Sequence, residues 1–185
     1  NLGFISTSHG IDNEIEILSA QDLATQAVID MKCYVNYYHK GTFKDQLVYK
    51  EQEVNVDLDL AHLKKLNAPI KLKIEKDGNQ YLVTGSYYIP VDAFSFQKEP
   101  VKIEKTLASL PASINTRVGT LSFTKNGNFK LKDGESLKAI IVSPEMAASG
   151  YAKALAVSQT SKTTTIAELV LKDEDPQRSI DYLNT

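Results

Sequence analysis

Polar and apolar residues alternate along short segments in the middle of the chain. The clearest case is residues 70–75, Ile-Lys-Leu-Lys-Ile-Glu, where every second side chain is apolar. Because successive side chains of a strand point to opposite faces, this alternation predicts a half-buried strand. Turn signals recur at Asp77-Gly78, Asn126-Gly127 and Asp133-Gly134, with no strong long helix between them. We therefore predict an antiparallel sandwich or partial barrel, with strands at 53–58, 70–75, 80–88, 101–105, 119–124 and 128–131.

The first part of the chain has a helical pattern instead, from residue 11 to residue 31. Ser19 and Asp22 have the spacing of a capping box within it, so we predict a short helix at 13–18 followed by a second helix. A strand at 33–38, rich in aromatic and β-favouring residues, ends at Gly41. The second helix is predicted to carry one apolar face, formed by Leu23, Ala27, Val28 and Met31.

Helices and strands also alternate in the last part of the chain. Residues 137–142 read LKAIIV, which predicts a buried strand, and Ser143-Pro144 then starts a helix through Lys153, with Ser143 as its N-cap. Two strands, at 155–160 and 164–171, follow. A final helix is predicted to begin with Asp175 as N-cap and Pro176 in its first turn.

These patterns predict an α+β fold with a discontinuous base. Residues 1–41 and 134–185 form a membrane-proximal α/β base from the two ends of the chain, and residues 42–133 form an antiparallel β-rich lobe inserted between them. At 185 residues the chain can bury one core with a substantial insertion.

Charge and cysteine content narrow the classes of function. The formal net charge is -2, which disfavours nucleic acid as a partner. Cys33 is the only cysteine, so no internal disulfide can form. It opens an apolar strand segment, which favours a buried core residue over a nucleophile.

The ends of the sequence suggest a piece of a longer protein. The chain starts at Asn1 without Met or a basic leader, and it has no apolar run near the roughly 18 residues that a membrane span needs. The final helix stops without a C-capping Gly. We therefore expect any membrane anchors to lie outside residues 1–185.

Both ends resemble one family. Residues 11–19 read IDNEIEILS, and residues 21–31 continue as an amphipathic helix. They resemble the polysaccharide co-polymerases, the chain-length determinants of O-antigen, capsule and exopolysaccharide, including the type fused to a cytoplasmic tyrosine autokinase. The strand, acidic turn and Pro-initiated helix at 164–176 resemble the segment that leads into that family's long helix. The residues that carry the resemblance are Asn13, Glu14, Ile15, Leu18, Asp175, Pro176 and Asn184.

The resemblance implies a non-catalytic scaffold at the periplasmic face of the bacterial inner membrane. Such a protein is anchored by two transmembrane helices, assembles into a ring of its own copies and modulates the length of a surface polysaccharide. The polymerase and the growing glycan are the further partners it implies, no cofactor is expected, and any kinase activity belongs to a cytoplasmic region. The middle departs from the family pattern, in which the connection is much shorter.

Several sites for chemistry are weakly supported. The chain has neither a phosphate-binding G-x-x-x-x-G-K-[ST] loop nor a G-x-S-x-G nucleophile elbow. His9, His39 and His62 lack the spacing of metal ligands, so surface or loop positions are favoured. The run Asp173-Glu174-Asp175 can hold Ca²⁺ or start a helix, and the helix start is favoured because the run lacks the interleaved ligands of a calcium loop.

Two kinds of residue are candidates for binding a glycan. A basic patch of Lys64, Lys65, Lys71 and Lys73 can bind an anionic glycan or a lipid phosphate, although Asp57, Asp59 and Glu75 make a mixed solvated face the default interpretation. Aromatic rings can stack on sugars, with partial burial in strands as the alternative. The tyrosines in question are Tyr34, Tyr37, Tyr38, Tyr87 and Tyr88.

Two rival functions stay open beside the scaffold. One is an extracytoplasmic glycan- or protein-binding module whose recognition surface is the β-rich lobe. The other is a hydrolase or transferase, which requires a deep pocket with convergent polar groups and a perturbed titratable group.

Overall fold

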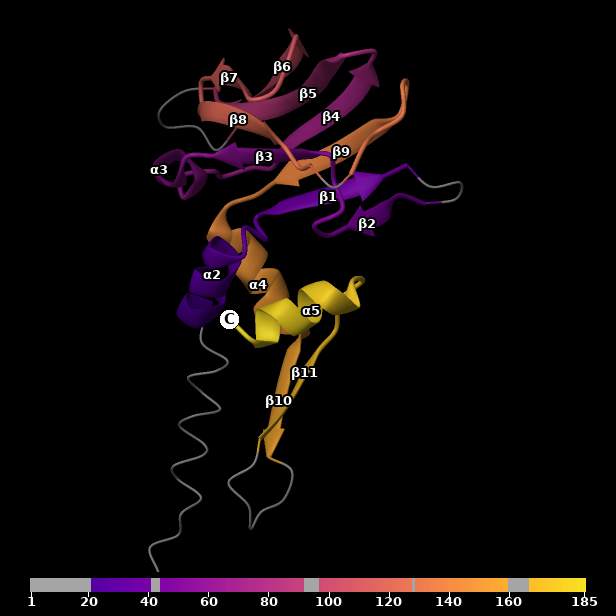
Figure 1. The fold of residues 1–185 in the computed structure, drawn as a ribbon. Helices are drawn as coiled ribbons and strands as arrows, with labels where there is room; N and C mark the ends of the chain where they lie inside the picture. The colour runs from indigo at the N-terminus through magenta and orange to yellow at the C-terminus, as the bar shows by residue number, and fades with distance from the viewer. Residues whose placement is uncertain (1–20, 41–43, 92–96, 128, 160–166) are drawn as a thin grey trace, which may run out of the picture. The chain divides into compact units, whose positions relative to one another are not determined.

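The computed structural model describes residues 21–40, 44–91, 97–127, 129–159 and 167–185 (Figure 1). Helices and antiparallel sheets occur together, which confirms the α+β class. The chain divides into two compact units: Cys33–Ser143 form the larger one, and the described residues of 21–32 and Pro144–Thr185 form the smaller one. No helix among the described residues is long and apolar enough to cross a membrane.

The larger unit contains two antiparallel sheets. The first has six strands in the order β2-β1-β9-β4-β5-β6, and the second has three in the order β3-β8-β7. A short helix, α3 (Leu60–Leu63), follows β3. The strands are β1 (Val35–His39), β2 (Gln46–Val48), β3 (Val54–Leu58), β4 (Ile70–Asp77), β5 (Gln80–Pro90), β6 (Lys98–Leu107), β7 (Ala112–Thr116), β8 (Gly119–Lys125) and β9 (Ser136–Ile141).

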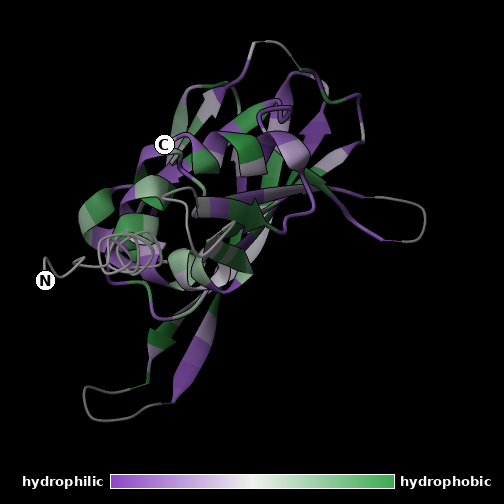
Figure 2. Cartoon of the chain, turned by 90° about the horizontal axis from the view of Figure 1, so that it is seen from below, coloured by the Kyte–Doolittle hydropathy of each residue, from purple (hydrophilic) through white to green (hydrophobic). Residues whose placement is uncertain are grey.

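Alternation along these strands produces a core between the two sheets. Ile70, Leu72 and Ile74 of β4 are buried while the lysines between them are exposed. Polar contacts also join the sheets, since the Tyr37 hydroxyl of β1 donates to the Val56 carbonyl of β3 at 3.2 Å and accepts from the Val56 N–H at 2.7 Å. The mixed green and purple colouring within single strands in Figure 2 reflects this one-sided burial.

The described residues of the smaller unit form three helices and a hairpin. Helix α2 (Gln21–Asp30) packs against α4 (Pro144–Ala154), and α5 (Pro176–Leu183) packs against β11 (Ala167–Leu171), which pairs with β10 (Leu155–Gln159). The rings of Tyr151 and Tyr182 stack with centroids 4.5 Å apart and planes 10° apart, so α4 and α5 are joined by an aromatic contact.

Most predicted elements of the middle region are confirmed, with two kinds of error. Strands were predicted within β3, β4, β5, β6 and β8, but no strand occurs among the described residues of 128–131. There, the backbone N–H of Leu131 donates to the buried Glu53 carboxylate instead of pairing in a ladder. The short elements β2, β7 and α3 were not predicted, because three to five residues carry too little periodicity.

The first helix region is confirmed only in part. Helix α2, Gln21–Asp30, lies within the predicted second helix, whereas the predicted helix at 13–18 and the predicted cap at Ser19 lie outside the described residues. Leu23, placed on the apolar face by prediction, is 47% exposed, and the buried positions are Ala24 and Val28. The buried face of α2 is therefore formed by Ala24 and Val28, one helical turn apart, and Leu23 lies outside it.

Unit boundaries differ from the predicted ones at 41/42 and 133/134. The predicted base strands at 33–38 and 137–142 correspond to β1 and β9, which pair with each other. Strand β9 also pairs with β4, so both strands belong to the six-stranded sheet of the larger unit. The pairing of β1 with β9 joins residues about one hundred positions apart, so no local sequence pattern indicates it.

Helix α5 begins as predicted, and its cap allows a direct test. The Asp175 side chain accepts from the Arg178 backbone N–H at 2.9 Å, with Pro176 at the first helical position. We expect Asp175→Ala to lower the free energy of unfolding of the smaller unit by about 1 kcal/mol, because an N–H loses its partner. Urea denaturation followed by circular dichroism measures this, and Asp175→Asn, which keeps a capping oxygen, should have little effect.

Candidate functional site

The outer face of the six-stranded sheet carries a row of lysines. Because Leu137 and Ala139 of β9 point into the core, Lys138 between them points outward, as do Lys71 and Lys73 of β4. The register places Lys138 directly opposite Lys73. The sequence alone does not indicate this pairing, because Lys73 and Lys138 are far apart along the chain.

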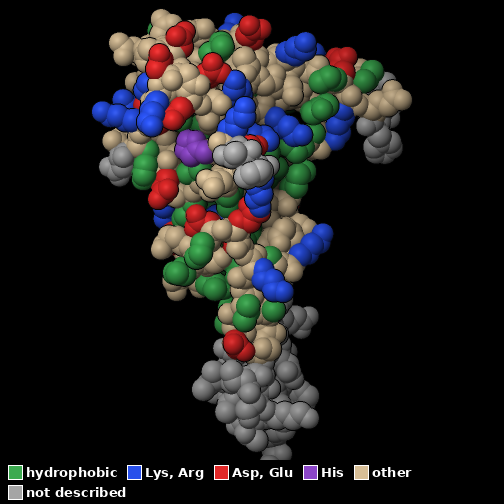
Figure 3. Space-filling model, turned by 90° about the vertical axis from the view of Figure 1, so that its right-hand side faces the viewer, with side chains coloured by type: hydrophobic (Ala, Val, Ile, Leu, Met, Phe, Trp, Pro, Cys, Tyr) green, Lys and Arg blue, Asp and Glu red, His purple; other side chains and the backbone are tan. Residues whose placement is uncertain are grey.

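A hollow of about 380 Å³ lies over this row. It is open to solvent, and Lys and Arg side chains (blue) gather across the middle of the larger unit in the space-filling view of Figure 3. Gly85 of β5 contributes backbone only to the lining, which keeps that part of the hollow unobstructed. The polar lining consists of the lysines Lys40, Lys71, Lys73 and Lys138, the carboxylate of Asp45, and the hydroxyls of Tyr38, Thr84, Ser86 and Ser136.

Positive charge dominates the hollow. Among the described residues, four lysines and one aspartate line it, which gives the lining a formal charge of +3 in a chain whose net charge is -2. Lys138 pairs with Asp45 at 3.2 Å and Lys73 pairs with Glu75, whereas Lys40 and Lys71 form no ion pair with any described residue. The described acidic residues therefore neutralise the hollow only in part.

No protein-family model and no curated protein sequence matches the chain. Of the residues that carry the resemblance, Asp175 caps α5, Pro176 is its first residue and Asn184 is its C-cap. Asn13, Glu14, Ile15 and Leu18 lie outside the described residues.

The structure divides the predicted basic patch. Lys71 and Lys73 line the hollow, whereas Lys64 and Lys65 follow α3 and are not part of the lining. Lys40 and Lys138 were missed by sequence reasoning. The position of Lys138 between the apolar residues of 137–142 was the available signal, because a lone charged residue in a strand that is otherwise apolar points away from the core.

The candidate tyrosines also separate into two groups. Tyr34, Tyr37 and Tyr87 are buried, with 5 to 7% of their surface exposed, so their rings are not available for stacking on a sugar. Burial raises the pKa of Tyr34 and of Tyr37 above the usual range, and the hydrogen bond from Tyr34 to Asp57 at 2.8 Å adds to the shift. Tyr38 and Tyr88 are half-buried, and Tyr38 lies in the hollow with the Lys138 ammonium 5.9 Å from its ring centre.

A buried carboxylate, Glu53, is the most enclosed charged group of the described residues. Only 1% of its surface is exposed, and it accepts from Lys76 Nζ at 2.9 Å, from the Tyr81 hydroxyl at 2.8 Å and from the Leu131 backbone N–H. Burial alone would raise the pKa of Glu53, but these hydrogen bonds outweigh it and hold the pKa below its usual value. Lys76 belongs to β4 and Tyr81 to β5, and Glu53 directly precedes β3. Its hydrogen bonds therefore link these three strands of the larger unit.

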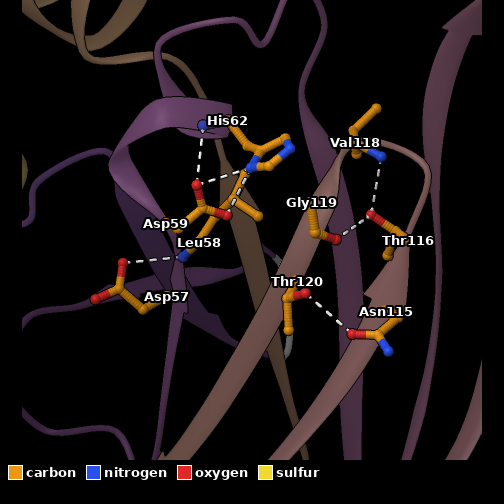
Figure 4. A network of polar contacts seen from close by, with 9 residues as sticks. All are labelled: Asp57, Leu58, Asp59, His62, Asn115, Thr116, Val118, Gly119 and Thr120. Atoms are coloured by element: carbon orange, nitrogen blue, oxygen red, sulfur yellow. Dashed lines mark hydrogen bonds and ion pairs between the residues drawn. The ribbon is translucent and has the colours of Figure 1, made fainter.

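His62 forms a surface pair with Asp59 (Figure 4). The ring Nδ1 lies 2.7 Å and 2.8 Å from the two carboxylate oxygens, and the Asp59 carboxylate also accepts from the His62 backbone N–H at 3.1 Å. Hydrogen bonding by His62 lowers the pKa of Asp59. Gly119 approaches closely, since a Cβ there would lie 2.8 Å from the His62 Cβ. This arrangement caps α3 and leaves no space for a ligand beside Gly119.

The other candidate ligands have structural roles or lie outside the described residues. His39 is the last residue of β1, and His9 is not described. Asp173 accepts from Arg178 Nε at 2.7 Å and from the N–H groups of Glu174 and Asp175. Among the described residues, no three His, Cys, Asp or Glu side chains lie close enough together to hold a metal ion. Cys33 is buried just before β1.

Proposed function

We propose that the chain is part of a non-catalytic scaffold of chain-length-determinant type, at the periplasmic face of the bacterial inner membrane. It regulates the length of a surface polysaccharide through association with its own copies and through contact with the polymerase and the growing glycan. In this proposal the smaller unit belongs to a membrane-proximal base, and the larger unit is a β-rich insertion in that base.

One observation carries the proposal. The two chain ends resemble the family, and the described residues of 21–32 and Pro144–Thr185 pack into one compact unit. Helix α2 from the first end contacts α4 from the second. Helix α5 then begins directly after the β10–β11 hairpin, with the Asp175 cap and Pro176 in place.

Exposed apolar side chains support self-association. Among the described residues, six of the eight large apolar side chains that are exposed belong to the smaller unit, although that unit is the shorter part of the chain. Apolar surface of this kind is commonly buried by association with another protein surface. The six residues are Leu23, Met146, Leu169, Val170, Ile180 and Leu183.

The proposal is tested by replacing the larger unit in the intact gene of the source bacterium. A deletion should remove residues 33–143 and join Lys32 to Pro144 through a flexible linker, because a cut at 42–133 would leave β1 and β9 without the rest of their sheet. We expect the modal length of the surface polysaccharide, measured by gel electrophoresis, to be shifted or lost. A full deletion of the gene should remove length control as well.

Two controls make the result decisive. Immunoblotting of the membrane fraction must show that the shortened protein accumulates to the normal level. Restoring the intact gene must restore the modal length. An unchanged length distribution after full deletion of the gene would reject the chain-length proposal.

A second candidate is an extracytoplasmic glycan-binding module. The lysine-lined hollow on the outer face of the six-stranded sheet favours it.

A further inference from the structure

We propose that the lysine-lined hollow is a binding site for the carboxylate groups of an acidic polysaccharide. The site comprises Lys40, Lys71, Lys73 and Lys138 with the hydroxyls of Tyr38 and Ser86 beside them. The proposal is based on a lining of formal charge +3 in a chain of net charge -2. Two adjacent strands, β4 and β9, place three of the lysines side by side, and Lys40 follows the end of β1.

The strand register places Lys73 of β4 directly opposite Lys138 of β9. Side chains directly opposite on adjacent antiparallel strands are close neighbours, and like charges in such a pair are destabilising. Lys71, two residues along β4, adds a third ammonium diagonal to Lys138. Lys138 and Lys73 each have one acidic partner, Asp45 and Glu75, whereas Lys71 forms no ion pair with a described residue. The excess positive charge of the lining is what a bound polyanion would neutralise.

Hydroxyl groups lie beside the lysines of the hollow. Thr84 lies opposite Lys73 and Ser86 opposite Lys71, so a hydroxyl stands beside each lysine of β4. Hydroxyls both donate and accept hydrogen bonds, as do the hydroxyls of a sugar. Tyr38 adds a half-buried ring next to Lys138. The site therefore offers ammonium groups for carboxylates and hydroxyl partners for the remainder of a sugar residue.

Other polyanions fit less well. A membrane surface is bound by basic residues together with apolar side chains that insert among the lipids. Among the described residues, Leu72 is the one large aliphatic residue of the lining, and its surface is 2% exposed. Single-stranded nucleic acid requires several stacking platforms along a basic groove, and Tyr38 is the single aromatic residue that the described part of the chain contributes to the lining. The combination of lysines and hydroxyls favours an acidic glycan.

This inference does not rest on the chain-length proposal. It is tested by direct binding to the purified chain of residues 1–185, whereas the chain-length proposal is tested by polysaccharide length in cells. Either can fail while the other holds, and the two failures are distinguishable.

The experiment is titration of the purified chain with polygalacturonate, followed by calorimetry. We expect saturable binding that weakens as salt is raised, and no binding of dextran, a neutral glucose polymer. The variant Lys73→Ser/Lys138→Ser should weaken binding by about fivefold for each lysine removed. Lys71→Ser, which breaks no ion pair with a described residue, should weaken it by about fivefold.

The matched control is Lys64→Ser/Lys65→Ser, which removes the same charge outside the hollow and should leave affinity within about twofold of the wild type. Thermal melting should show that Lys73→Ser/Lys138→Ser is folded, since both lysines are exposed and surface ion pairs contribute little to stability. Absence of polygalacturonate binding would overturn the proposal, as would equal weakening by the control variant. Tighter binding to phosphatidylglycerol vesicles or to oligothymidylate than to polygalacturonate would reject the assigned ligand class.

Discussion

Replacing Glu53 with alanine is expected to lower the free energy of unfolding of the larger unit by about 3 to 5 kcal/mol. The carboxylate is buried and accepts three hydrogen bonds, from Lys76, Tyr81 and the Leu131 backbone N–H. Removing it leaves the Lys76 ammonium, whose side chain is only 18% exposed, without its buried partner. It also leaves a hydroxyl and an N–H unpaired in the interior, and each such group adds its own desolvation cost.

Two variants make this measurement interpretable. Glu53→Gln keeps a carbonyl oxygen that can accept, so we expect a smaller loss of about 2 kcal/mol. Glu104→Ala removes an exposed carboxylate from β6 and should change stability by less than about 0.5 kcal/mol. Denaturation in urea measures all three, and a Glu53→Ala loss no larger than that of Glu104→Ala would contradict the role given to Glu53.

The same carboxylate predicts a dependence on pH. Because the pKa of Glu53 is lower in the folded chain than in the unfolded chain, its contribution is fully present above the unfolded value of about 4.3. The contribution is lost as the pH falls through the folded pKa, since the proton then favours the unfolded chain. Wild type should therefore lose stability more steeply than Glu53→Gln when the pH falls below about 4.3.

Replacing Gly85 with alanine should cost about 3 kcal/mol, at the upper end of the range for overpacking. A Cβ at Gly85 would lie 2.1 Å from the Lys71 carbonyl oxygen and 3.0 Å from the Leu72 Cα, both of which are backbone atoms of the neighbouring strand β4. Backbone in the middle of a six-stranded sheet has little freedom to move, so β4 and β5 must separate locally. The displacement also disturbs the hollow, because Gly85 and Lys71 line it together.

Gly150→Ala is the matched control for this change. Gly150 is an exposed residue of α4, and a Cβ there would meet no atom within 4 Å. We expect this variant to be stabilised by up to about 1 kcal/mol, since alanine favours the helix. Far-ultraviolet circular dichroism in urea compares the two, and equal stability of Gly85→Ala and wild type would show that the close approach is relieved without cost.

Sequence alone identified the elements whose signal is local. The alternation at 70–75 corresponds to β4, and the Asp77-Gly78 signal corresponds to the β4–β5 turn, where Gly78 has a φ of +58°. The Asp175-Pro176 pair corresponds to the start of α5. Each of these depends on backbone geometry within a few residues, so a sequence pattern is enough to find it.

Tertiary structure decided how the site is composed. Sequence periodicity places Lys71 and Lys73 on one face of a strand, but it does not show that β9 lies beside β4 and sets Lys138 opposite Lys73. It likewise gives no sign that Glu53 is enclosed by Lys76 and Tyr81. Strand order and register follow from burying all the apolar faces at once, a condition on the whole core that no short segment expresses.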